Sequence, residues 1–147
     1  MSAAQRQLST FDAQALSNSL HGLGKLRYHP DELVLSSWVS AARPKLSDFN
    51  AQELSNSLNA MANLPFMPPS DFIEALLVEA RRGISTFNAQ DLSNTINALG
   101  KLEYHPKDEG FMAVWVAAAQ DKLPTSNPQE LSNSLHGLGK LGYHPGD

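Results

Sequence analysis

Polar side chains recur at helical spacing through this 147-residue sequence. Gln14, Asn18, His21 and Lys25 stand four, three and four residues apart, which places them on one face of an α-helix. Amide and imidazole groups can hydrogen-bond the edges of bases, and a lysine ammonium can neutralise a phosphate. The same polar stripe returns three times, as Gln52/Asn56/Asn59/Asn63, Gln90/Asn94/Asn97/Lys101 and Gln129/Asn133/His136/Lys140. These stripes are candidate RNA contacts, with an ordinary solvated helix face as the alternative.

The positions within a stripe differ in how they vary. Asn18 is the same in every copy, so we interpret it, like Gln14, as a buried amide that ties helix to loop rather than as a base contact. The position of His21 changes between copies but stays polar, which suits a base reader or, equally, a solvated face. The lysines are candidate phosphate contacts or dipole partners at helix C-termini. The predicted RNA-binding residues are His21, Lys25, Asn59, Asn63, Asn97, Lys101, His136 and Lys140.

Other chemistry fits the sequence less well. His29, His105 and His144 lie at least one repeat apart, and stacked helices are about 10 Å apart, too far to share a metal ion. An aromatic residue precedes each of these histidines, and also Met67 in the second repeat. We expect it to pack in a turn rather than to stack on a base (Tyr28, Phe66, Tyr104, Tyr143). Cysteine is absent, and the recurring Ser17 and Ser19 have no His/Asp partner. We expect no enzyme activity, no cofactor, no metal and no small-molecule substrate.

A repeated unit positions the stripes. The tripeptide Leu-Ser-Asn recurs at intervals of 38, 38 and 39 residues, beginning at Leu16, Leu54, Leu92 and Leu131. The sequence divides into a lead-in (1–10), three full repeats (11–48, 49–86, 87–125) and a truncated fourth with a first helix only (126–147). A fixed period of this length is typical of repeat architectures.

Each unit is predicted to begin with a capped helix. The cap positions hold Asp12, Asn50, Asn88 and Asn127, and copies two to four add an acid three residues later, as in a capping box. Phenylalanines precede the first three caps and can staple onto the first leucine of the helix. Leucines at steps of four, three and three, such as Leu16, Leu20, Leu23 and Leu26, form one apolar stripe. Glycine or alanine at positions 22 and 24 and their copies indicates close helix stacking.

A second helix follows the proline of each unit. Its buried side is predicted to carry Val34/Leu35/Trp38/Ala42, Phe72/Ile73/Leu76/Ala80 and Phe111/Met112/Trp115/Ala119. The fold class is therefore all-α, an α-solenoid of tandem hairpins with about seven helices. The last helix should have an uncovered apolar face, which implies an unstable end, a missing continuation or self-association.

Composition limits the partners. The net charge is −4 and the pI is near 5.7, which argues against a generally basic nucleic-acid binder but not against a local basic stripe. No stretch approaches the ~18 apolar residues of a membrane span. The N-terminus, Met1 to Thr10, is too short and too polar for a signal peptide, and we expect no membrane partner.

The sequence from Phe11 to Asp147 resembles the octotricopeptide repeat family. The resemblance rests on the 38-residue period and on the motif Phe-Asn-Ala-Gln-Glu-Leu-Ser-Asn-Ser-Leu…Leu-Gly-Tyr-His-Pro. The resemblance implies an α-solenoid that binds single-stranded organellar RNA, in a chloroplast or mitochondrion, and governs transcript processing, stability or translation. Many members carry Pro-Pro-Pro-Glu-Trp before the second helix, of which Pro68-Pro69 survives here. Sequence-selective RNA binding is our leading hypothesis, and a protein-interaction scaffold using the exposed terminal repeat is the rival.

Overall fold

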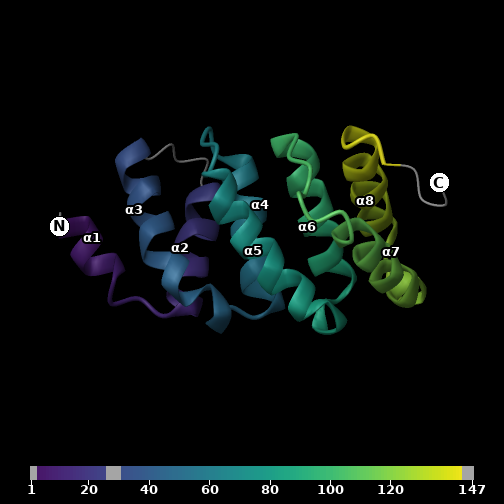
Figure 1. Cartoon of the computed structure of the whole chain (residues 1–147), viewed down its shortest axis with the longest axis horizontal. Coiled ribbons are helices and arrows are strands. Elements are labelled where there is room, and N and C mark those ends of the chain that lie inside the picture. The colour runs from purple at the N-terminus through teal and green to yellow at the C-terminus, as the bar shows by residue number, and fades with distance from the viewer. Residues whose placement is uncertain (1–2, 26–30, 144–147) are drawn as a thin grey trace.

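The helical array is seen in a computed structural model that describes residues 3–25 and 31–143. These residues form an all-α solenoid, as predicted, and no strand occurs among them (Figure 1). The α-helices are α1 (Ala3–Leu8), α2 (Ala13–Lys25), α3 (Glu32–Ala42), α4 (Ala51–Asn63), α5 (Ser70–Arg82), α6 (Ala89–Leu102), α7 (Phe111–Lys122) and α8 (Pro128–Lys140). Three short 3₁₀ helices join the hairpins, at Arg43–Asp48 (η1), Ile84–Thr86 (η2) and Leu123–Thr125 (η3). The predictions for Leu26, Tyr28, His29 and His144 fall outside the described residues.

The first helices of the repeats begin at the predicted caps. The Asn50 side chain accepts a hydrogen bond from the Glu53 N–H at 2.8 Å, and the Glu53 carboxylate accepts one from the Asn50 N–H at 3.0 Å. The same reciprocal box closes at Asn88 and Asn127. Asp12 caps α2 through the Ala15 N–H at 2.8 Å without a returning acid. Each box satisfies two donors that a helix start leaves unpaired, which fixes where the polar stripes begin.

The first helices, α2, α4, α6 and α8, stack directly on one another as one layer, and α3, α5 and α7 form the second. Small residues determine how closely the first helices pack against one another. A Cβ placed on Gly137 would lie 2.5 Å from the Ile96 carbonyl oxygen, and one on Gly100 would lie 2.9 Å from the Gly137 Cα. These distances allow no side chain, so the predicted close stacking is confirmed between α6 and α8.

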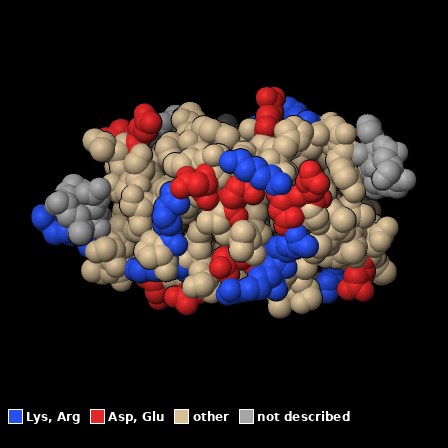
Figure 2. Space-filling view, in the orientation of Figure 1, with Lys and Arg blue, Asp and Glu red and all other residues tan. Residues whose placement is uncertain are grey.

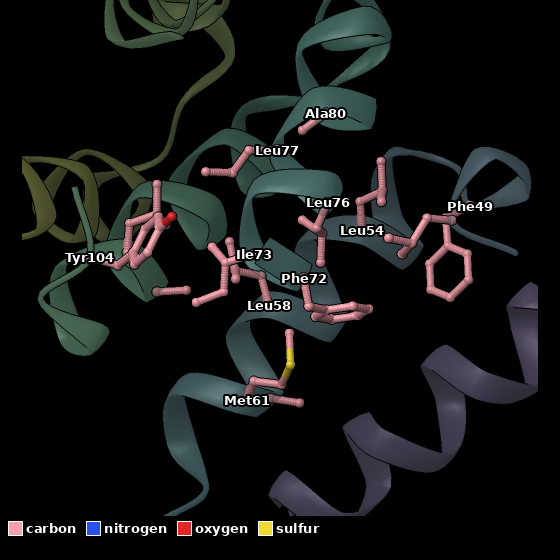
Figure 3. Close-up of a cluster of buried hydrophobic side chains, with 14 of the residues drawn as sticks. Phe49, Leu54, Leu58, Met61, Phe72, Ile73, Leu76, Leu77, Ala80 and Tyr104 are labelled. Atoms are coloured by element: carbon pink, nitrogen blue, oxygen red, sulfur yellow. The ribbon is translucent and has the colours of Figure 1, made fainter. Parts of the chain in front are cut away.

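The core lies between the two layers. Leu58 and Met61 of α4 face Phe72 of α5 in a fully buried cluster (Figure 3). Both tryptophans of the second helices donate their indole N–H to a first-helix carbonyl, Trp38 to Leu16 at 2.8 Å and Trp115 to Leu92 at 3.0 Å. These bonds fix the distance between the two helices of a hairpin while the rings fill the core.

Val34 departs from the predicted buried side of the second helices, and Met112 and Ala119 are only half-buried. Val34 is 37% exposed, whereas Leu35, Trp38 and Ala42 on the same helix are buried as predicted. Its equivalents Phe72 and Phe111 are buried because each packs on a preceding second helix. The helix in that place beside α3 is the short α1 of the lead-in, which was not predicted.

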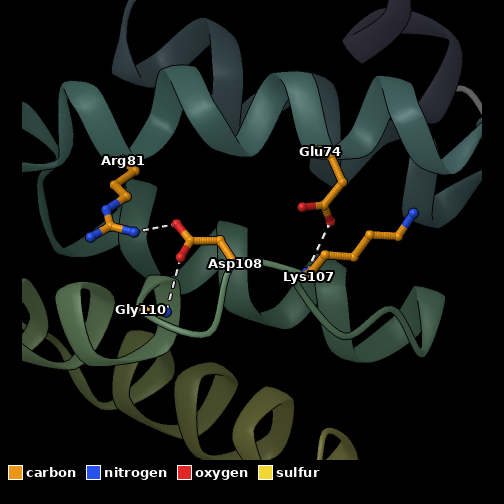
Figure 4. A network of polar contacts seen from close by, with 5 residues as sticks. All are labelled: Glu74, Arg81, Lys107, Asp108 and Gly110. Atoms are coloured by element: carbon orange, nitrogen blue, oxygen red, sulfur yellow. Dashed lines mark hydrogen bonds and ion pairs between the residues drawn. The ribbon is translucent and has the colours of Figure 1, made fainter.

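Ion pairs, here called polar rungs, join the end of one second helix to the start of the next. Arg43 pairs with Asp71 at 2.9 Å, and Arg81 pairs with Asp108 at the equivalent place one repeat later (Figure 4). The Arg81 hydrogen bond, and then the Gly110 N–H at 2.9 Å, hold the pKa of Asp108 below its usual value. The rungs align the ends of successive hairpins, although exposed ion pairs of this kind add little stability.

The turn aromatic of the third repeat packs inward, as predicted. Tyr104 is buried, and its hydroxyl donates to a Glu74 carboxylate oxygen, which also accepts the Lys107 N–H at 3.2 Å. Burial, followed by the Glu74 hydrogen bond and charge, raises the pKa of Tyr104 well above its usual value. Phe66 and Tyr143 at the equivalent positions are half-buried.

Candidate nucleic-acid interface

The polar stripes lie on the outer side of the first-helix layer. The exposed members are Gln14, Asn18, Lys25, Gln52, Asn63, Gln90, Lys101, Gln129, His136 and Lys140. His21, Asn56, Asn59, Asn94 and Asn133 are half-buried. Because the helices stack in order, the stripes run side by side across the layer.

The interpretation of Asn18 and its copies as buried amides is wrong. Asn18 is exposed and its copies are only half-buried, and Gln14 and its copies are exposed as well. Asn18 comes two residues after the buried Leu16, which turns it about 200° around the helix and away from the core. The invariant amides are therefore accessible to a ligand.

The polar residue buried in the first three repeats is the serine one position earlier, which sequence reasoning missed, whereas its fourth copy, Ser132, is exposed. The Ser17 hydroxyl donates to the Glu53 carbonyl at 3.3 Å, and the Ser55 hydroxyl donates to the Asp91 carboxylate at 3.2 Å. Both bonds run from one first helix to the next. The signal for this role was available, because the serine is identical in all four copies and directly follows a core leucine.

The position that varies between repeats is reached unevenly. His21 and Asn59 are half-buried and His136 is exposed, but Asn97 is only 8% exposed. The difference comes from the neighbouring helix, since Gly137 lets α8 settle against the backbone of Ile96 and Asn97. The structure thus leaves three of the four candidate base readers open to a ligand.

The stripes make contact across repeats at two places. The Lys101 ammonium donates to the Asn63 amide oxygen at 2.9 Å, which joins α6 to α4. A shallow polar hollow of about 180 Å³ lies between α6 and α8 and includes Gln90, Asn94, Gln129 and Asn133. Adjacent helices therefore present one joint polar surface rather than isolated side chains.

The stripes are electrostatically distinct from the rest of the chain. None of their positions is acidic, and three hold lysine, in a protein of net charge −4. The acids of the first turns, Glu53, Asp91 and Glu130, accept N–H bonds within the capping boxes. By contrast, Figure 2 shows Lys/Arg and Asp/Glu intermixed on the face it displays, with neither sign gathered into one large patch.

Residues 3–25 and 31–143 contain neither a metal-binding cluster nor a membrane-spanning helix. Within these ranges, no three His, Asp or Glu side chains gather into a group that could hold a metal ion. None of the helices described there combines the length and apolar character needed to cross a bilayer. His105, the histidine of the turn motif that the structure describes, is exposed.

Comparison with known protein families assigns most of the chain. Residues 31–147 match the family described as "Tbc2 translation factor, N-terminal domain". The match includes the second helix of the first repeat and everything after it, and so three of the four polar stripes. No curated protein matches the chain.

Proposed function

Since this chain belongs to the family of the Tbc2 translation factor N-terminal domain, we propose that it serves translation by binding single-stranded RNA along its polar stripes. The resemblance of its repeats to octotricopeptide repeats supports the same assignment. It also supports action on transcripts inside a chloroplast or mitochondrion. The proposed role is that of a binding module without catalytic activity.

The observation that carries the proposal is the accessible polar surface of the stripes on the first-helix layer, since none of the stripe positions is acidic. Asn18 is identical in every repeat and exposed, which suits a contact made with each nucleotide in the same way. The position of His21, Asn59 and His136 holds histidine in some repeats and asparagine in others and is accessible in these three, which suits contacts that discriminate between bases. Lys25, Lys101 and Lys140 lie at the C-terminal ends of their helices, where each can approach a phosphate.

The affinity should be modest and salt-dependent. Each phosphate contact to a single strand contributes a slope of roughly 0.7 to the fall of log K with log salt, so three lysines give about −2. The experiment is a filter-binding titration of the chain against a randomised single-stranded RNA pool, at several salt concentrations. Absence of retained RNA at low salt would overturn RNA binding by this chain.

Matched variants locate the surface. Lys140→Gln should lower the affinity and reduce the slope by roughly 0.7. Lys107→Gln, an exposed lysine beside the second-helix layer, should change neither. Equal effects of the two variants would show that charge alone, and not the stripe, attracts RNA. Substituting His21, Asn59 and His136 together should change the selected sequence, and an unchanged selection would remove the reading role.

A second candidate function is protein recognition. It is favoured by the two leucines that α8 leaves exposed, Leu131 and Leu135. A variant of these leucines should leave RNA affinity unchanged if the two functions use separate surfaces.

A further inference from the structure

The polar hollow between α6 and α8 has a floor that neither helix satisfies. Its volume of about 180 Å³ is about a dozen times the space that one water needs. Among the residues around it, Ser93 alone is buried, at 1% exposure, and so forms the floor. The Ser93 hydroxyl has no hydrogen-bond partner within residues 3–25 and 31–143. Because an unpaired buried hydroxyl costs free energy, a ligand that pairs with it gains affinity.

The junction one repeat earlier closes this place with a hydrogen bond. There the Ser55 hydroxyl donates to one carboxylate oxygen of Asp91 at 3.2 Å, and the other oxygen accepts a cap N–H. The corresponding acid beside Ser93 is Glu130. One of its oxygens accepts the Asn127 N–H at 2.9 Å, and no donor in the part of the chain that the structure describes bonds to the other. The hollow thus lies between a hydroxyl and a carboxylate oxygen that both lack the partner found one repeat earlier.

The third repeat offers a base this hollow rather than its variable position. Asn97 is only 8% exposed, because Gly137 lets α8 pack against its backbone. By contrast, Asn94 and Asn133 belong to the invariant amide position, are half-buried and line the hollow. A base that reaches the junction of α6 and α8 therefore meets the polar hollow.

The groups around the hollow favour a neutral ligand with a donor next to an acceptor. No lysine or arginine lines it and Glu130 is acidic, which disfavours a phosphate. The carboxylate only accepts hydrogen bonds, whereas the Ser93 hydroxyl can donate one. On their Watson–Crick edges, adenine and cytosine carry an amino donor beside a ring-nitrogen acceptor, and carboxylates and amides are common partners of these amino groups. Uracil has a carbonyl oxygen in place of the amino group, and this oxygen would lie against the carboxylate.

We propose that the polar hollow binds one adenine or cytosine base of single-stranded RNA. The amino group of the base donates to Glu130, and its ring nitrogen accepts from the Ser93 hydroxyl. Gln90 and Gln129 are exposed side chains around the hollow, and they turn aside to admit the base. This inference rests on the proposed RNA binding, and it gives the third repeat a base preference that Asn97 does not supply.

The test compares the affinities of the full chain for oligocytidylate and oligouridylate of equal length by filter binding. The wild type should prefer oligocytidylate about tenfold. Ser93→Ala should weaken oligocytidylate binding about fivefold through the lost hydrogen bond, and should leave oligouridylate binding within about twofold. Glu130→Gln preserves the capping box and should remove most of the preference, because an amide can also donate to the uracil carbonyl.

The chain offers a matched control for each variant. Ser57→Ala removes another buried hydroxyl that has no partner in the described ranges, but one that does not line the hollow. Glu53→Gln makes the same change of charge in the capping box of α4. Both controls should keep the preference for oligocytidylate within about twofold. If Ser93→Ala and Glu130→Gln also keep it, the hollow is not a base site, although RNA binding itself stands.

A second measurement separates the hollow from the proposed function. If neither oligonucleotide is retained, RNA binding by this chain fails, and titration with free cytidine and uridine followed by amide NMR then decides on the hollow alone. Cytidine should shift the amide signals of Ser93, Glu130 and Asn133, and uridine should shift them much less. Equal shifts with both nucleosides, or no shift at these three residues, would overturn the proposal.

Discussion

Two glycines at one repeat position should respond in opposite ways to the same substitution. Gly22 in α2 and Gly137 in α8 are equivalent, and Ala60 and Ala98 stand between them in the stack. A Cβ at Gly22 would meet no atom within 4 Å, whereas a Cβ at Gly137 would meet the Ile96 carbonyl oxygen at 2.5 Å and its carbon at 2.7 Å. Both obstacles at Gly137 are backbone atoms, which cannot rotate away.

The magnitudes follow from two opposing effects. Alanine stabilises a helix interior by about 1 kcal/mol relative to glycine, and Gly22→Ala should gain this in full. At Gly137 the same gain is opposed by an overpacking cost of about 2–3 kcal/mol, in the upper part of the usual range, because the obstacles are backbone atoms and α8 must move away from α6. We expect Gly137→Ala to lower the free energy of unfolding by about 1–2 kcal/mol. For a chain of this size, each kcal/mol moves Tm by roughly 2–4 °C.

The assay is thermal and urea unfolding followed by circular dichroism, with hydrogen exchange of the α8 amides to locate the effect. Gly22→Ala should raise Tm, and Gly137→Ala should lower it and speed exchange in α8. Because the two sites lie at opposite ends of the array, their effects should add in the double variant. A Gly137→Ala protein as stable as the wild type would refute the close approach of α6 and α8.

Three further predictions concern individual side chains. Glu103 has φ of 53° at the end of α6, where the equivalent residue of α8 is Gly142, so Glu103→Gly should raise the free energy of unfolding by about 0.5–1 kcal/mol in urea titration. The raised pKa of Tyr104 means that the unfolded chain loses this proton first, so its contribution to stability is complete below about pH 10 and declines at higher pH. Tyr104→Phe should flatten that decline in unfolding curves measured from pH 8 to 11. Trp38→Leu should cost about 1 kcal/mol more than Trp115→Leu in the same assay, because Trp38 also loses an aromatic contact with Phe72. Equal costs would contradict a stabilising role for that contact.

Local chemistry made the helix starts predictable. The caps at Asn50, Asn88 and Asn127 are set by residues three positions apart, so the sequence contains everything needed to place them. The leucine stripe was equally readable, because one helix carries the whole period. The exposure of Leu131 and Leu135 on α8 was predictable as well, because the given repeats place no further helix over them.

Features that depend on the distance between helices were not predictable in this way. Asn97 is buried while Asn59 is half-buried because a glycine in the next repeat, 40 residues later, brings α8 onto its backbone. The burial of Ser17 and the exposure of its neighbour Asn18 could be predicted only by knowing which side of α2 faces α4. Val34 depended on α1, whose six residues show no strong period.

The contacts between first helices also set a length scale for any polymer that follows them. Neighbouring packed helices are roughly 8–10 Å apart, whereas stacked bases in a strand are about 3.4 Å apart. A strand that offers one base to each repeat must therefore be pulled out until adjacent bases no longer stack. Gly100 and Gly137 allow α6 and α8 to approach closely. A strand passing from α6 to α8 would therefore be stretched less than one passing between the other first helices.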